Sequence, residues 1–219
     1  LKIYTKDPEF RFFMSIQILL IVACTLVMIS HQYFDSSWQD FEQVVFQAVS
    51  ISTTTGYTTS NFAEWPSFVP MLLIIASFIG GCAGSVGGGL RVARILVLYL
   101  QGARELKRFV HPNLVYPIKW GKNVLDERVI GSIWAFFSAY LLVFTICLLS
   151  VIACGVEPFD AFNAVLASIN NLGPGLGSVS SNMTAMPDSA KWVLTIAMVC
   201  GRLEIFTLLA LFTPAFWKE

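Results

Sequence analysis

The feature that most constrains this chain is its series of long apolar runs separated by short polar segments. Three runs are long enough to cross a lipid bilayer, which takes about 20 apolar residues in a helix: 12–29, 129–153 and 192–217. Only 13% of the 219 residues are charged and 56% are hydrophobic, whereas an ordinary soluble domain has about 25% charged residues. We therefore expect an all-α membrane protein.

A fourth apolar run is interrupted. Residues 68–79 are apolar, residues 80–89 are rich in glycine, and apolar character resumes at 92–100. Twelve helical residues rise only about 18 Å, against a hydrocarbon core of about 30 Å. We expect one helix broken at membrane depth by a glycine-rich loop. A phosphate-binding loop is disfavoured because the Gly-Lys-Ser/Thr ending is missing; a simple flexible kink is the other alternative.

Two further apolar segments, 41–52 and 159–169, are too short to span a bilayer. Each ends in a cluster of small or polar residues: Thr53-Thr54-Thr55-Gly56-Tyr57 in the first and Asn170-Asn171-Leu172-Gly173-Pro174-Gly175 in the second. Apolar stretches of this length are typical of re-entrant segments. A helix buried in a soluble core is the alternative, and the neighbouring spans disfavour it.

The chain also repeats itself. Phe46-Gln47-Ala48-Val49 recurs as Phe162-Asn163-Ala164-Val165, and each copy is followed by a glycine-bearing cluster, a proline and another apolar run. A unit of span, short helix, loop and span is therefore expected twice, once in residues 1–110 and once in residues 111–219.

Charge predicts the orientation of these units in the membrane. The N-terminus, the loop 91–128 and the C-terminus together hold 12 of the 14 basic residues, whereas Lys191 is the only base among the segments on the other side. By the positive-inside rule the basic loop and both termini are expected in the cytoplasm. Both short helices would then enter the bilayer from outside.

The two loop clusters have the composition of an ion-conducting pore. Backbone that is not helical at membrane depth must be buried in protein or line water. Rings of loop carbonyls can replace the hydration shell of K⁺, and Thr54-Thr55-Gly56-Tyr57 is similar to the Thr-Val-Gly-Tyr heart of potassium-channel filters. Residues 171–175 form a degenerate counterpart. The pattern predicts a filter for monovalent cations.

Together these motifs resemble the Trk/Ktr/HKT superfamily of potassium transporters, most closely the bacterial Trk-type membrane subunit. The resemblance rests on the two clusters above, on the glycine-rich run 80–89 and on Gly201-Arg202-Leu203-Glu204. It implies that ion-coordinating carbonyls come from Thr54, Thr55, Asn171 and Leu172, and that Gly56 and Gly173 are filter glycines. Gly175 remains an alternative to Gly173. Phe46 to Gly56 is 10 positions and Phe162 to Gly173 is 11, so the second loop is expected to be longer by one residue.

The resemblance also implies a gate below the filter. Its residues would be Gly84, Gly87, Gly88, Gly89 and Arg202. A charge in a span costs about 2.5–3.5 kcal/mol, so Arg202, near the middle of the last apolar run, should face protein or water. Facing the pore, it would repel cations and hold the glycine-rich loop. The alternative is a buried pair with a carboxylate, of which Glu204 is the nearest in sequence.

The superfamily has four such repeats, and this chain resembles the third and fourth. The chain begins at Leu1, so we expect it to be part of a longer polypeptide whose amino-terminal repeats complete the pore. Further expected partners are a second copy in a homodimer, a cytoplasmic nucleotide-binding regulatory ring and the lipid of the bacterial inner membrane, but no nucleic acid. K⁺ is the expected transported ion, and no organic cofactor is expected.

Two other functions were weighed against ion uptake. An intramembrane enzyme is disfavoured because His31 and His111 lie outside the apolar runs and the sequence contains no serine–base or paired-carboxylate pattern. A non-conducting scaffold would leave both filter-like loops unexplained. Whether a channel or a coupled symporter is present stays open at this point.

Overall fold

The chain is described by a computed structural model that covers residues 6–33, 38–85, 87–112, 116–121, 123–180, 182–203, 206–207 and 217. Within these residues the helices are α1 (Pro8–Ser30), α2 (Trp38–Ser52), α3 (Phe68–Ala76), α4 (Val92–Val110), α5 (Glu127–Ala153), α6 (Pro158–Ile169) and α7 (Asp188–Arg202). Short 3-10 turns follow the two short helices, η2 (Phe62–Glu64) and η3 (Gly177–Val179). The mostly helical fold is confirmed.

The basic loop contains a small hairpin that the sequence did not predict. Strands β1 (Lys119–Trp120) and β2 (Asn123–Val124) pair antiparallel, with Lys119 opposite Val124. Each strand has only two residues, which is too short for the alternation of apolar and polar side chains that predicts a strand.

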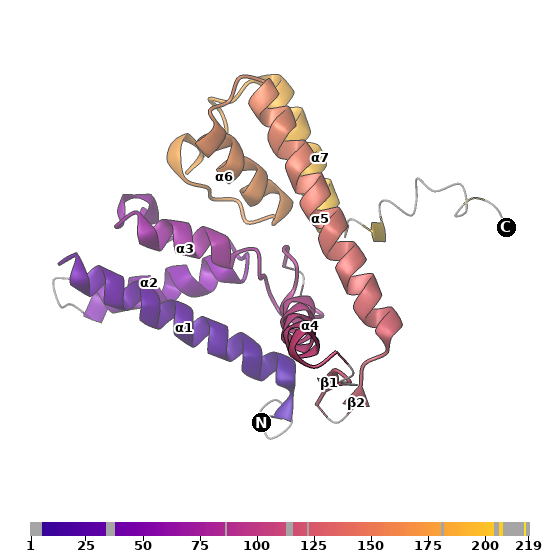
Figure 1. Cartoon of the computed structure of the whole chain (residues 1–219). Helices are drawn as coiled ribbons and strands as arrows, with labels where there is room; N and C mark the ends of the chain where they lie inside the picture. Colours follow the sequence, from indigo (N-terminus) through magenta and orange to yellow (C-terminus); the bar gives the residue numbers. More distant parts are fainter. Residues whose placement is uncertain are drawn as a thin grey trace.

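The helices form two groups (Figure 1). In the first, α1, α2 and α3 pack on one another, and in the second α5, α6 and α7 do so. Helix α4 contacts both groups, through α1 and through α5. One hydrophobic core runs through the two groups, with Leu73 and Ile74 of α3 and Leu166 and Ile169 of α6 fully buried in it. The two groups therefore share a common interior.

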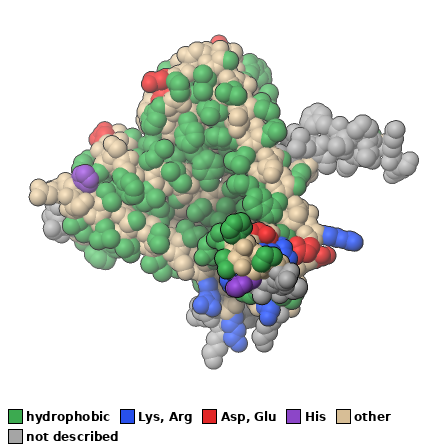
Figure 2. Space-filling model, viewed as in Figure 1, with side chains coloured by type: hydrophobic (Ala, Val, Ile, Leu, Met, Phe, Trp, Pro, Cys, Tyr) green, Lys and Arg blue, Asp and Glu red, His purple; other side chains and the backbone are tan. Residues whose placement is uncertain are grey.

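Helices α1 and α5 are long and apolar enough to cross a membrane, with 23 and 27 residues. Their outward side chains are apolar as well: Leu19 is 70% exposed and Leu149 is 61% exposed. Figure 2 shows hydrophobic side chains over much of the face in view, with Lys and Arg side chains only toward its lower end. An exposed apolar surface of this extent fits a lipid environment. Asp7 and Asp126 cap the two helices by accepting hydrogen bonds from backbone amides.

The break in the fourth apolar run is confirmed, because α3 ends at Ala76 and α4 begins only at Val92. Hydrogen bonds close the intervening segment on itself: the Leu90 amide donates to the Phe78 carbonyl at 2.9 Å and the Val92 amide to the Gly81 carbonyl at 3.0 Å. The glycine-rich segment, residues 80–89 with Val86 outside the described residues, is therefore a fold of the backbone between two half-helices.

The expected last span is not a single helix over 192–217. Helix α7 ends at Arg202, and the Leu203 amide closes its last turn by bonding to the Val199 carbonyl. Arg202 therefore lies at the end of α7, and its expected position near the middle of a span stays a prediction. The apolar composition of a segment indicates that it prefers lipid to water, but it does not determine whether the segment is one continuous helix. Most of residues 204–219, including Glu204, lie outside the described residues.

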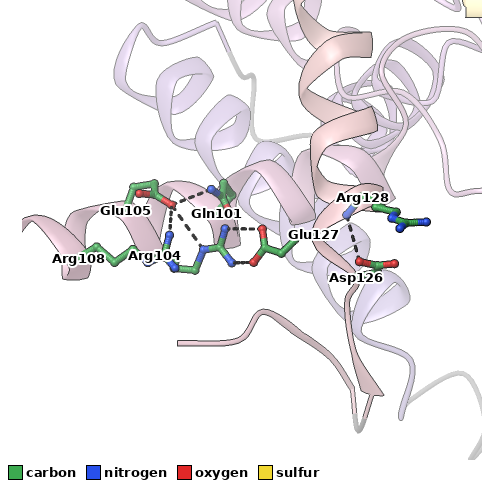
Figure 3. Close-up of polar contacts among 7 residues, drawn as sticks. All are labelled: Gln101, Arg104, Glu105, Arg108, Asp126, Glu127 and Arg128. Atoms are coloured by element: carbon green, nitrogen blue, oxygen red, sulfur yellow. Dashed lines mark hydrogen bonds and ion pairs between the residues drawn. The ribbon is translucent and has the colours of Figure 1, made fainter. Parts of the chain in front are cut away.

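An ion pair fixes α4 against α5 (Figure 3). Arg104 is only 3% exposed and donates from both Nη atoms to the Glu127 carboxylate, with Nη2 at 3.1 Å from Oε2. The hydrogen bond to Glu127 raises the pKa of Arg104. A bidentate pair sets orientation as well as distance, and it orients the end of α4 next to the start of α5.

Candidate functional site

The first loop (residues 53–60) and the second loop (residues 170–180) leave their short helices with the same backbone conformation. The Thr55 amide bonds to the Ser50 carbonyl at 2.8 Å, and the Leu172 amide bonds to the Ala167 carbonyl at 2.9 Å. Thr54 and Asn171 both have a positive φ, +57° and +51°. Each residue of the first loop named here has its counterpart in the second loop 117 positions later in the sequence. The same conformation arises from Thr-Thr-Gly in one loop and Asn-Leu-Gly in the other.

Glycines follow two residues later in both loops. Gly56 has a φ of +81° and Gly173 a φ of +97°, a region that favours glycine. Gly175 has no positive φ, so the backbone pairs Gly56 with Gly173. The expected extra residue in the second loop is wrong, because each glycine follows its helix by four positions, from Ser52 and from Ile169. The extra position relative to the Phe46 motif lies within the helix.

The two loops meet at Gly56. A Cβ at Gly56 would lie 2.1 Å from the carbonyl oxygen of Leu172, so only a hydrogen atom fits between them. On one side of this contact lies a hollow of about 600 Å³, lined by Gly56, Thr58, Thr59, Ser60, Asn61, Phe62, Pro174 and Ser180. All six predicted filter residues therefore sit in two loops that touch through Gly56 and Leu172.

Side chains of the short helices hold both loops in place. In the first loop the Ser50 hydroxyl donates to the Tyr57 carbonyl at 2.6 Å and Gln47 donates to the Ser60 carbonyl at 3.0 Å. In the second, Asp160 accepts from the Ser178 amide at 3.2 Å. Sequence reasoning missed these anchors. The only signal available was that each is a polar residue in an apolar segment.

The glycine-rich segment lies against both loops. The Gly88 amide donates to Thr54 Oγ1 at 2.9 Å, and a Cβ at Gly88 would lie 1.8 Å from the Asn170 carbonyl oxygen. Gly87 also approaches Thr54, since its Cβ would lie 2.9 Å from Oγ1. Gly84 differs, because no atom lies within 4 Å of its Cβ position. Among the predicted gate glycines, Gly87 and Gly88 are thus in close contact with the loops and Gly84 is not.

The far end of the glycine-rich segment is held by α1. The Ala83 amide donates to Glu9 Oε1 at 2.5 Å, and the Glu9 side chain is buried. Glu9 lies in the first turn of α1, where a carboxylate interacts favourably with the helix dipole. The sequence analysis did not single out Glu9.

A buried polar network behind the loops joins the ends of α3 and α6 to the middle of α5. Tyr140 of α5 donates to Asn170 Oδ1 at 2.6 Å, and Asn170 Nδ2 donates to the Ser77 hydroxyl at 3.1 Å. Asn170 and Ser77 are fully buried and Tyr140 is 2% exposed. Buried polar groups that satisfy one another fix a unique geometry. This network couples the start of the second loop to the start of the glycine-rich segment.

Arg202 and the glycine-rich segment lie around the same cavity. Both border a cavity of about 230 Å³ whose lining includes Ser85, Gly87, Gly89, Arg91 and Arg202. Gly201 lets α7 approach the end of α6 closely, because a Cβ at Gly201 would lie 1.8 Å from the Ile169 carbonyl oxygen. Arg202 thus lies on the same cavity as the glycine-rich segment, at the end of α7.

The sequence profile of the TrkH family, described as a cation transport protein, matches residues 3–219. The chain belongs to the TrkH family. It is 57% identical over 218 residues to the Trk system potassium uptake protein TrkH of Vibrio parahaemolyticus and 56% identical over 219 residues to that of Escherichia coli K12. Each alignment covers all of this chain and 45% of the relative. The E. coli K12 protein TrkG is 34% identical over 218 residues, covering 98% of this chain and 44% of TrkG.

The crystal structure of the potassium transporter TrkH from Vibrio parahaemolyticus superimposes with a TM-score of 0.93 and 57% sequence identity. The match covers 98% of this chain and 46% of that one. This chain therefore spans about half the length of the TrkH-family proteins that it matches. The family is one of transport proteins, which agrees with the expectation that the chain is not an enzyme.

Proposed function

We propose that this chain forms half of the pore of a potassium uptake protein in the bacterial inner membrane. The observation that carries the proposal is the contact of Gly56 with the Leu172 carbonyl, between two loops of matching backbone conformation. The relatives' names, Trk system potassium uptake protein, supply the ion. K⁺ is then the transported substrate, and the other half of the pore comes from the amino-terminal repeats of the same polypeptide.

In this proposal residues 1–110 and 111–219 are the third and fourth pore repeats. Helices α2 and α6 are the pore helices, and their C-terminal ends direct a partial negative charge toward the ion. The carbonyls of Thr54, Thr55, Asn171 and Leu172 replace its hydration shell, with Gly56 and Gly173 as the filter glycines. The hollow of about 600 Å³ beside Gly56 is the outer vestibule. The basic loop and both termini lie in the cytoplasm.

The glycine-rich segment is the gate in the same proposal. Gly87, Gly88 and Gly89 obstruct the path between the loops and the cavity of about 230 Å³, and Gly84 lies in the middle of the segment, where its Cβ position is open. Arg202, beside that cavity, adds an electrostatic barrier to cations. A homodimer and a cytoplasmic nucleotide-binding ring that docks on the basic loop complete the assembly.

The test is ion flux into liposomes that contain the full-length protein. K⁺ uptake that exceeds Na⁺ uptake, and that falls when Gly56 is replaced, supports a pore lined by the two loops. Equal uptake of both ions by the parent protein, or no uptake with the regulatory ring present, contradicts it. A scaffold would give no flux under any condition.

A further inference from the structure

The strongest unassigned feature is a hollow at the basic end of the molecule. It measures about 330 Å³ and lies between α1, α4 and β1. Its walls combine two basic side chains, Arg11 and Lys119, with apolar and aromatic ones, Phe12, Leu96, Leu100 and Trp120. Tryptophan is enriched where proteins meet the boundary between lipid headgroups and hydrocarbon. The composition suits a ligand with an anionic head and an apolar body.

The hollow continues into an apolar groove along α1. This groove measures about 530 Å³, shares Ser15 with the hollow, and is lined by Ile18, Leu19, Val22, Ala23 and Leu26. From Ser15 to Leu26 a helix rises about 16 Å, close to half of a hydrocarbon core about 30 Å thick. The groove therefore has the length of one acyl chain in one leaflet.

The charges of the hollow suit an anion. The nearby carboxylates that the structure describes are engaged elsewhere: Glu9 accepts from Ala83, Glu127 pairs with Arg104, and Glu105 pairs with Arg104 and Arg108. Among the described residues, neither the Arg11 nor the Lys119 side chain forms an ion pair with a carboxylate. Lys119 and Lys107 together line a neighbouring pocket, so positive charge extends beyond the hollow.

We propose that this surface binds one anionic phospholipid of the cytoplasmic leaflet. Its headgroup phosphate lies between Arg11 and Lys119, its glycerol region lies at Ser15, and an acyl chain follows Ile18, Leu19, Val22 and Leu26. Basic pockets between membrane helices on the cytoplasmic side recognise such headgroups. The proposal rests on the membrane orientation given under the proposed function, but it concerns lipid binding, so its failure would leave the ion pathway untouched.

The test counts phosphatidylglycerol molecules retained by the purified full-length protein in native mass spectrometry, with phosphatidylcholine as the neutral reference. Each basic side chain at a membrane surface contributes about fivefold in affinity. Arg11→Gln and Lys119→Gln should each weaken phosphatidylglycerol binding about fivefold, and the double variant should weaken it about 25-fold. If the double variant folds poorly, the two single variants still test the proposal.

Arg128→Gln is the matched control, because Arg128 is an exposed base at the same end of the molecule that does not line the hollow. In Figure 3 its side chain points away from the Arg104–Glu127 pair. Unchanged retention in this control supports a specific site. Equal losses in the control and in the groove variants would mean general surface attraction, and equal retention by the double variant and the parent would also overturn the proposal.

Ser15→Trp separates a lipid from a free phosphate. It fills the junction of hollow and groove, so it should abolish phosphatidylglycerol retention while the basic residues stay in place. If Ser15→Trp has no effect and inorganic phosphate displaces the bound anion, the site takes a soluble anion and the lipid proposal is wrong. No effect of Ser15→Trp without such displacement would mean that protein covers the groove in the full-length molecule, which also overturns it.

Discussion

The amide of Gly88 donates a hydrogen bond of 2.9 Å to the hydroxyl oxygen of Thr54. This bond is buried and joins the glycine-rich segment to the first loop, 34 residues earlier in the chain. A buried amide that loses its acceptor costs about 1–3 kcal/mol. The Thr54 hydroxyl is therefore one of the groups that hold the segment beneath the loops.

Thr54→Val keeps the shape of the side chain and removes that acceptor. We expect the glycine-rich segment to loosen and K⁺ flux without the regulatory ring to rise, by up to about tenfold for a loss of 1.4 kcal/mol. Thr54→Ser keeps the hydroxyl and should change flux less. Flux per inserted full-length molecule in liposomes is the measurement, and equal flux from the Val and Ser variants would show that the hydrogen bond does not restrain the segment.

Gly56→Ser tests the contact between the loops. Its Cβ would lie 2.1 Å from the Leu172 carbonyl oxygen at a φ of +81°, so the second loop must move. We expect the K⁺/Na⁺ permeability ratio to fall at least about tenfold, because a displaced carbonyl ring no longer fits the dehydrated ion.

Gly173→Ser is the matched control for that substitution. Gly173 has a φ of +97°, but no atom lies within 4 Å of its Cβ position. The Gly173→Ser substitution therefore introduces backbone strain of about 1–2 kcal/mol without a clash between its Cβ and the facing loop. If both variants lose selectivity equally, strain rather than the Gly56–Leu172 contact accounts for the effect.

Arg202→Ala should increase K⁺ flux. A unit charge 4 Å from a cation raises its energy by about 4 kcal/mol at an effective dielectric of 20, and water in the cavity reduces this value. Arg202→Lys keeps the charge and should change flux less. Flux per inserted molecule is compared for the three proteins. A variant Arg202→Ala that inserts normally and conducts no faster than the parent would remove Arg202 from the barrier.

Tyr140→Phe tests the buried network behind the loops. It removes the donor to Asn170 Oδ1 and leaves that oxygen buried, at a cost of about 1–3 kcal/mol. We expect an apparent melting temperature lower by about 2–10 °C. Tyr99→Phe is the control, since Tyr99 is 66% exposed, and its melting temperature should match the parent. Equal melting temperatures for both variants would mean that the network adds no stability.

The sequence by itself determined the helical segments, their membrane character and the place of the two loops. The length of an apolar run indicates whether a helix can span a bilayer. Helices α1 and α5, the short helices α2 and α6, and the break before Val92 were therefore all predictable. The glycine and threonine clusters also identified the loop residues, because only a few residue types tolerate such backbone.

Only the tertiary structure decided which residues meet. The pairing of Gly56 with Gly173 rather than Gly175 is seen only in the backbone angles, and the end of α7 at Arg202 only in the backbone of its last turn. Glu9 lies 74 residues before Ala83, and Asn170 lies 93 residues after Ser77. Such contacts depend on the relative positions of helices, which the local preferences of single segments do not encode. A polar residue in an apolar run signals that a partner exists, but the fold decides which one it is.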